Sequence, residues 1–83
     1  MPFQLFHRLV DPGSARVRQF VVEHGLTAEV KFRNVSFDEP LAELKARGAD
    51  DRVPALWDGE QLFVGAEAVI ARLRAHLDVG RGK

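Results

Sequence analysis

The sequence contains no cysteine among its 83 residues, and this absence removes several kinds of chemistry at once. Without a thiol, the chain cannot form a disulfide framework, bind metal through thiolates or attack a disulfide, because each of these needs the cysteine sulfur. The three histidines are scattered and have no ligand spacing that would replace it. We therefore exclude thiol–disulfide redox catalysis by this chain and expect no metal site.

An excess of charge of one sign and long apolar stretches are also missing. Twelve Lys and Arg balance twelve Asp and Glu, so there is no net field to attract a phosphate backbone or an anionic lipid surface. No apolar run approaches the roughly 20 residues that cross a bilayer, and no basic region followed by an apolar stretch begins the chain. These absences argue against nucleic-acid and membrane partners and make the cytoplasm the default location.

The composition that remains is that of one ordinary globular domain. Apolar residues make up 46% and charged residues 29% of the chain, which is far from the bias of disordered proteins. A chain of this length supports a single core, and it shows neither an internal repeat nor a linker. We predict one domain over residues 1–83, with residues 78–83 as a flexible tail.

The first half of the chain predicts a strand, a helix and a second strand. Residues 3–10 are apolar at positions of both parities, which is typical of a central strand covered on both faces. Asp11 and Pro12 predict the start of a helix over residues 12–24, with Asp11 as its cap. Residues 27–35 alternate like a half-buried edge strand, with an apolar face of Ala28, Val30 and Phe32 and an outward face of Glu29, Lys31 and Arg33.

The second half predicts a helix, a hairpin and a last helix. Asp38 suits the cap position of a short helix. Residues 53–57 and 61–64 are two short apolar runs, and Asp58-Gly59 between them suits a two-residue hairpin turn. A third amphipathic helix is marked by apolar residues at helical spacing: Ala66, Val69, Ile70, Leu73 and Leu77.

This order of elements predicts an α/β fold, β-α-β-α-β-β-α, in which three helices pack on a four-stranded mixed sheet. Two parallel strands joined by a right-handed helical crossover, followed by an antiparallel hairpin, place the first strand in the centre of the sheet and the second at an edge. Both placements agree with the residue patterns of these strands.

Two stretches carry a resemblance to a known family. Residues 11–18 start with Asp11 and Pro12 at the head of the first helix, and residues 52–56 contain Val53-Pro54 before the hairpin. Together with the element order, they resemble the glutaredoxin family and the N-terminal domain of glutathione transferases over essentially the whole chain. Where glutaredoxins carry the two cysteines of Cys-Pro-x-Cys, this chain has Asp11 and Ser14. The resemblance implies a cysteine-free, thioredoxin-like domain with a cis-proline at position 54.

The resemblance also implies a glutathione site built from three segments. The head of the first helix lies near the ligand's sulfur, the segment before the hairpin lies along its peptide, and the start of the last helix lies near its γ-glutamyl group. Helix N-terminal N–H groups suit the ligand's carboxylate, and Glu67 suits its amine, although the family usually has Asp or Ser at that position. The residues implied are Asp11, Pro12, Ser14, Val53, Pro54, Gly65, Ala66 and Glu67.

Each of these features also has a plain structural explanation. Asp11 and Ser14 are suitable helix caps, and a cis-proline shapes its loop whether or not a ligand is present. Trp57 falls in a predicted strand, so we expect it in the core rather than as a stacking platform. We expect the helical arginines on solvated faces, namely Arg16, Arg18, Arg72 and Arg74. The histidines are expected at surface or partly buried positions, namely His7, His24 and His76.

Three functions stay open, and we favour the first, a redox-inactive binding module whose cleft holds glutathione or an extended peptide. The second is a glutathione transferase-like enzyme in which Ser14 stabilises the thiolate. Asp11 at the catalytic position opposes it, because a negative charge raises the pKa of a neighbouring thiol, and 83 residues leave no room for the second domain of transferases. The third is a structural or partner-binding domain with Phe6 or Phe37 in a contact patch, and the charged edge strand then favours a monomer.

Overall fold

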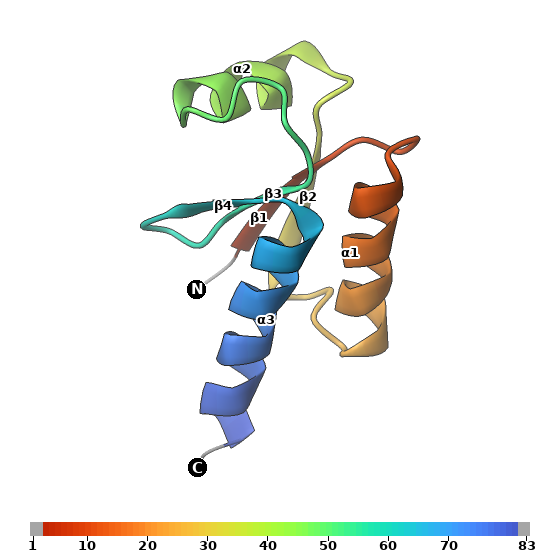
Figure 1. Ribbon diagram of the computed structural model, residues 1–83, viewed down its shortest axis with the longest axis vertical. Helices are drawn as coiled ribbons and strands as arrows, with labels where there is room; N and C mark the ends of the chain where they lie inside the picture. The colour runs from red at the N-terminus through yellow and green to blue at the C-terminus, as the bar shows by residue number, and fades with distance from the viewer. Residues whose placement is uncertain (1–2, 82–83) are drawn as a thin grey trace.

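A computed structural model describes residues 3–81 and contains four strands and three helices in the predicted order (Figure 1). The strands are β1 (Phe3–His7), β2 (Val30–Asn34), β3 (Ala55–Trp57) and β4 (Leu62–Val64), and the helices are α1 (Pro12–Glu23), α2 (Asp38–Ala46) and α3 (Ala66–Arg81). The sheet order is β2-β1-β3-β4, with β1 parallel to β2 and the other neighbours antiparallel. The predicted α/β, thioredoxin-like sheet is confirmed, with the first strand central and the second at an edge.

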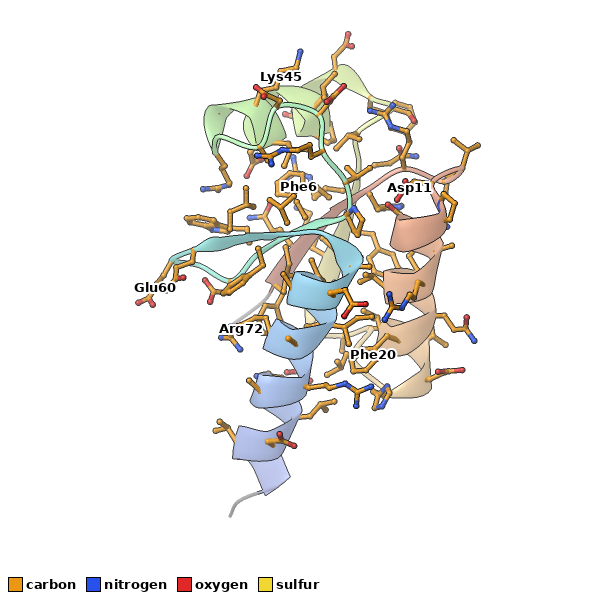
Figure 2. All side chains as sticks on the ribbon, in the orientation of Figure 1. Phe6, Asp11, Phe20, Lys45, Glu60 and Arg72 are labelled. Atoms are coloured by element: carbon orange, nitrogen blue, oxygen red, sulfur yellow. The ribbon has the colours of Figure 1, made fainter. Side chains whose placement is uncertain are left out.

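The side chains of β1 divide the interior into two cores. Successive strand residues point to opposite faces, so Phe3 and Leu5 face α1 and α3, whereas Phe6 lies between the sheet and α2 (Figure 2). The core beneath α1 and α3 contains Phe3, Leu5, Val17, Phe20, Val21, Leu26, Val30, Leu56, Val69, Ile70 and Leu73. The smaller core beneath α2 contains Phe6, Val35, Leu44, Ala49 and Ala55. Both parities of β1 are apolar because both of its faces are covered.

The ends of α1 follow the prediction, whereas the start of α2 does not. The Asp11 Oδ2 atom accepts the N–H of Ser14 at 2.7 Å, which makes Asp11 the N-cap of α1. The C-cap of α1 is His24, and Gly25 follows it with a φ of +67°, the left-handed conformation that commonly ends a helix. In α2 the N-cap is Phe37, and Asp38 is the first helical residue. The prediction of Asp38 as the cap was therefore wrong. As the first helical residue, Asp38 places a negative charge near the N-terminus of α2 instead.

The first strand is shorter than predicted. It ends at His7, and Leu9 and Val10 lie in a loop where they are 64% and 86% exposed. The Ser14 hydroxyl accepts the N–H of Arg8 at 3.2 Å, so the backbone donor that would continue the ladder is used by the helix start. The apolar pattern alone therefore overestimated the strand by three residues.

The edge strand also differs from its alternation pattern. Ala28 and Glu29 precede β2, and Phe32, predicted on the covered face, is exposed because it lies at the sheet edge. Glu29 instead pairs with His76 of α3 at 2.6 Å. Arg33, predicted to point outward, lies on the α2 side, where its guanidinium pairs with Glu43 at 2.9 Å. An amphipathic pattern identified the strand but not what covers each face.

The hairpin turn is shifted by one residue, and the last helix is longer than predicted. Asp58 N–H donates to Gln61 O at 3.1 Å, so the two turn residues are Gly59 and Glu60 rather than Asp58 and Gly59. Gly59 has a φ of +102°, which primed hairpin turns require at their first central position. The α3 helix continues to Arg81 through most of the predicted tail of residues 78–83. Residues 82–83 of that tail lie outside the described residues.

Candidate functional site

The three segments of the predicted site meet at one end of the protein. Both α1 and α3 begin at the same end of the sheet (Figure 1). A methyl group placed on Gly13 would lie 3.1 Å from Pro54 Cδ and 3.8 Å from Ala66 Cβ, so α1 approaches both other segments there. The Gly65 N–H donates to the Pro54 carbonyl at 2.8 Å. The head of α1, the loop before β3 and the start of α3 therefore form one continuous surface.

The loop before β3 contains backbone groups that have no partner among the described residues. The Val53–Pro54 peptide bond is cis, with Pro54 buried and Val53 half-buried. Within residues 3–81, neither the N–H nor the carbonyl of Val53 forms a hydrogen bond. An extended peptide that lies along this segment would find one backbone donor and one backbone acceptor available.

At the head of α1, Asp11 caps the helix, whereas the Ser14 side chain holds the preceding loop rather than acting as a cap. Ser14 is 0% exposed, and its hydroxyl oxygen is already the acceptor for Arg8 N–H. Asp11 is half-buried and Pro12 is exposed. Of the residues predicted near the ligand's sulfur, the surface thus presents a carboxylate and a proline ring but no hydroxyl.

The start of α3 offers backbone donors and an exposed carboxylate. Gly65 precedes the helix and has no side chain that could cap it, and no described side chain bonds to the first-turn N–H groups. Glu67 follows with its side chain 90% exposed, and its Oε2 lies 3.5 Å from Nη1 of Arg16 on α1. An ion pair this exposed contributes little to stability and rearranges easily. The position can therefore accept a group that carries both a carboxylate and an ammonium.

Arg18 and His7 lie behind the site in a cluster that the sequence did not predict. The Arg18 guanidinium donates to the carbonyls of Arg8 and Leu9, both at 3.3 Å, and lies 3.1 Å from His7 Nδ1. His7 is buried, and its pKa is lowered by this burial and then by the charge of Arg18. The prediction of a solvated Arg18 was wrong, and so was that of a surface or partly buried His7. His7 shares the parity of Phe3 and Leu5, and that parity was the signal for its burial.

Other arginines expected in solvent also serve packing. Arg72 donates to Asp58 at 3.0 Å, and the guanidinium of Arg74 lies over the Phe20 ring at 5.1 Å. Trp57 packs against the α2-side core, as predicted, with Arg47 over its ring. Of the two aromatic residues considered for a contact patch, Phe6 is fully buried and only Phe37 is exposed.

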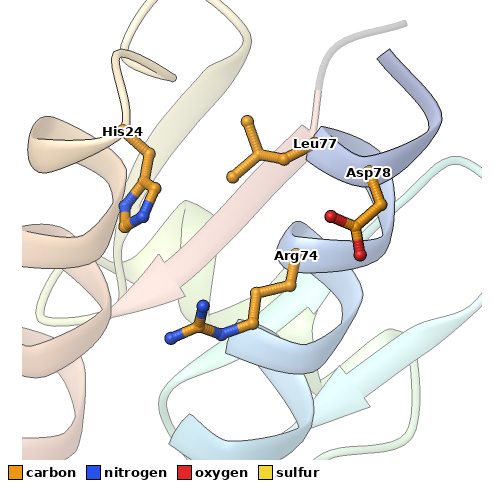
Figure 3. Close-up of a pocket in the computed structure, with 4 residues that line it drawn as sticks. All are labelled: His24, Arg74, Leu77 and Asp78. Carbon is orange, nitrogen blue, oxygen red and sulfur yellow. The ribbon is translucent and has the colours of Figure 1, made fainter. Parts of the chain in front are cut away.

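Two hollows of the surface lie away from the predicted site. A pocket of about 110 Å³ lies between the C-terminal ends of α1 and α3 and is lined by His24, Arg74, Leu77 and Asp78 (Figure 3). A second, of about 210 Å³, continues along the same helices beside Phe20 and Ile70. Neither of these two pockets includes any of the eight predicted site residues. In the described part of the chain, no three His, Cys, Asp or Glu residues are placed to hold a metal ion.

A comparison with protein families identifies the relationship. The model of the glutathione S-transferase, N-terminal domain family matches residues 1–71. The chain belongs to this family. A search of curated proteins found no match.

The match with the glutathione S-transferase N-terminal domain includes all three site segments, because it ends inside α3 at residue 71. This member of the family has no cysteine, and the serine in its first helix points inward. No helix among residues 3–81 has the length and apolar character needed to cross a membrane.

Proposed function

We propose that this glutathione S-transferase N-terminal domain binds glutathione without activating its thiol. The observation that carries the proposal is the close approach of Gly13 to both Pro54 and Ala66, which brings the three predicted segments to one surface. The family membership supplies the ligand class.

The chemistry of the surface suits the cysteinyl and γ-glutamyl parts of the tripeptide. The free N–H and carbonyl of Val53 would pair with the cysteinyl backbone of the ligand. The uncapped N–H groups at the start of α3 suit the γ-glutamyl carboxylate, because the helix dipole favours negative charge there. The Glu67 carboxylate would pair with the ligand's ammonium group and would give up its weak contact with Arg16.

The groups beside the ligand's sulfur argue against the alternative of a transferase that uses Ser14. A hydroxyl stabilises a thiolate only by donating to it, and Ser14 has no exposed surface from which to donate. The Asp11 carboxylate lies at this position, and its negative charge raises the pKa of a neighbouring thiol. The bound ligand therefore stays a thiol at neutral pH, in the role of a binding partner rather than a nucleophile.

Amide NMR of the ¹⁵N-labelled protein tests this proposal with two ligands, reduced glutathione and S-methylglutathione. We expect saturable shifts of the Val53, Ala66 and Glu67 amides with both, and dissociation constants within about twofold of each other, because an uncharged thiol contributes little. A much weaker S-methyl ligand would indicate thiolate stabilisation and contradict the inert role. No shift with either ligand at millimolar concentration would refute glutathione binding, and shifts with an extended peptide alone would move the proposal to peptides.

A further inference from the structure

The loop Arg8–Asp11 joins β1 to the head of α1 and carries part of the proposed binding surface. Its tip is poorly anchored by packing, because the side chains of Leu9 and Val10 point into solvent. One internal backbone bond closes it, from the Asp11 N–H to the Arg8 carbonyl at 3.1 Å. The other anchors come from α1. The N–H groups of Ser14 and Ala15 hold Asp11, the Ser14 hydroxyl accepts from Arg8, and Arg18 donates to the carbonyls of Arg8 and Leu9.

Arg18 holds the loop and the end of β1 at the same time. Its Nη1 atom donates to the Arg8 carbonyl and lies 3.1 Å from His7 Nδ1, while Nη2 donates to the Leu9 carbonyl. Because a guanidinium has only donors, the hydrogen bond to His7 requires a lone pair on Nδ1. His7 must then be neutral, with its proton on Nε2.

The surroundings of His7 leave no compensation for a second positive charge. Within residues 3–81, the charged side chain that contacts the His7 ring is Arg18 from α1, and the β2 side offers the Phe32 ring at 5.5 Å between centroids. A proton on Nδ1 would remove the acceptor and place an imidazolium directly against the guanidinium. Arg18 would then have to withdraw, and its bonds to the two loop carbonyls would be lost with it.

We infer that Arg18 and His7 are positioning residues that hold the loop Arg8–Asp11 against α1 and release it when His7 is protonated. The lowered pKa of His7 is consistent with this, since the folded protein resists the proton that breaks the contact. Release would loosen the segment that leads into Asp11 and so weaken ligand binding in acid. That last consequence rests on the proposed function, whereas the loop release does not.

The test measures hydrogen exchange of the Asp11 amide in the ligand-free protein between pH 7.5 and pH 5.5, as a protection factor that removes the intrinsic pH effect. As the pH is lowered, we expect the protection factor to decrease in the unmodified protein and in the control His24→Gln. It should stay constant in His7→Gln, because the glutamine side-chain oxygen can accept a hydrogen bond from Arg18 at every pH. Arg18→Lys keeps the positive charge but loses the two guanidinium nitrogens that donate to separate carbonyls, so the protection factor should fall about fivefold at all pH values. A pH-independent loop, or the same pH dependence in His7→Gln, would overturn the inference.

A second measurement covers the case in which His7→Gln does not fold. The ring ¹⁵N shifts of His7 in the unmodified protein should show an unprotonated Nδ1 at pH 7.5, and its protonation should share a midpoint with the loss of Asp11 protection. Separate midpoints would contradict the coupling. A glutathione titration at each pH then separates the two proposals, because a pH-dependent loop without ligand shifts refutes only glutathione binding.

Discussion

Asp58 joins the hairpin to α3 through both of its carboxylate oxygens. Its Oδ1 accepts the N–H groups of Glu60 and Gln61 at 2.9 and 2.7 Å, and its Oδ2 accepts from Arg72 at 3.0 Å. Burial alone would raise the pKa of Asp58, but these hydrogen bonds and the charge of Arg72 outweigh it, and the pKa is lowered. One residue thus fixes both the turn and the position of the hairpin against the last helix.

We predict that Asp58→Ala lowers the free energy of unfolding by about 2–3 kcal/mol, because two turn N–H groups and the Arg72 guanidinium lose their acceptor. Urea denaturation followed by circular dichroism measures this change. Asp51→Ala, at an exposed loop position, is the control and should change stability by less than about 0.5 kcal/mol. Equal effects of the two substitutions would contradict the role given to Asp58.

Glu67 is the residue on which the proposed contact with the ligand's ammonium group depends. We predict that Glu67→Gln weakens glutathione binding about fivefold, since an exposed ion pair contributes about 1 kcal/mol. Stability should be unchanged because the side chain is 90% exposed. Isothermal titration calorimetry measures the affinity, with Glu60→Gln in the hairpin turn as the matched control. A variant that binds as tightly as the control would remove Glu67 from the site.

Among the elements, α2 has the narrowest attachment to the rest of the fold. Leu44 is the one residue of this helix that is buried, and it packs with Phe6 and Val35. At its other side, Glu43 accepts from both Arg33 and Arg47 at 2.9 Å. The position of α2 thus depends on buried Leu44, on partly buried Leu41 and on one cluster of charges.

We predict that Leu44→Ala costs about 2–4 kcal/mol of stability, because it removes buried methyl groups and leaves a cavity beneath α2. Leu9→Ala is the control: the same side chain is shortened at a position that is 64% exposed, so the loss should stay below about 0.5 kcal/mol. Chemical denaturation gives both values, and hydrogen exchange should show the α2 amides losing protection first. Uniform loss of protection over all helices would show that α2 is not a separate weak point.

At this scale the sequence predicted each element and missed details of their ends. Periodicity and the cap at Asp11 gave α1 to within a residue, because those signals are local. The end of β1 could not be predicted, since it depends on the Ser14 hydroxyl seven positions beyond His7. Arg33 was misplaced for a similar reason: its partner Glu43 lies on a helix whose docking is a tertiary event.

For the whole molecule, acid should act in two separate steps. The pKa of His7 is lowered, so its contribution to stability is complete above about pH 6.5 and is lost as the pH falls below that value. The carboxyls of Glu43 and Asp58 also have lowered pKa values, so their contribution is present above about pH 4 and is lost only below it.

Urea denaturation at a series of pH values tests this order. We predict an initial fall in unfolding free energy as the pH drops below about 6.5, then a second fall below about pH 4. His7→Gln should remove the first fall and leave the second. A single transition near pH 4 in the unmodified protein would show that His7 does not contribute.

The candidate site as a whole was predictable only in part. The resemblance named the three segments, and the approach of Gly13 to Pro54 and Ala66 shows them together. The inward direction of Ser14 and the Arg18–His7 contact could not be predicted from the sequence. Both depend on how the loop after β1 folds back against α1. Fold-level patterns therefore locate a candidate surface before they identify which side chains face it.

The cation stacked on Trp57 has an optical consequence. The chain has one tryptophan and no tyrosine, and the Arg47 Cζ atom lies 3.9 Å from the indole centroid on the α2 side of the sheet. Indole fluorescence of the unlabelled protein therefore has a single emitter, placed where α2 meets the hairpin. The opposite face, with α1 and α3, contains no tryptophan. Emission should thus follow the docking of α2, while ligand binding at the heads of α1 and α3 should leave the spectrum largely unchanged.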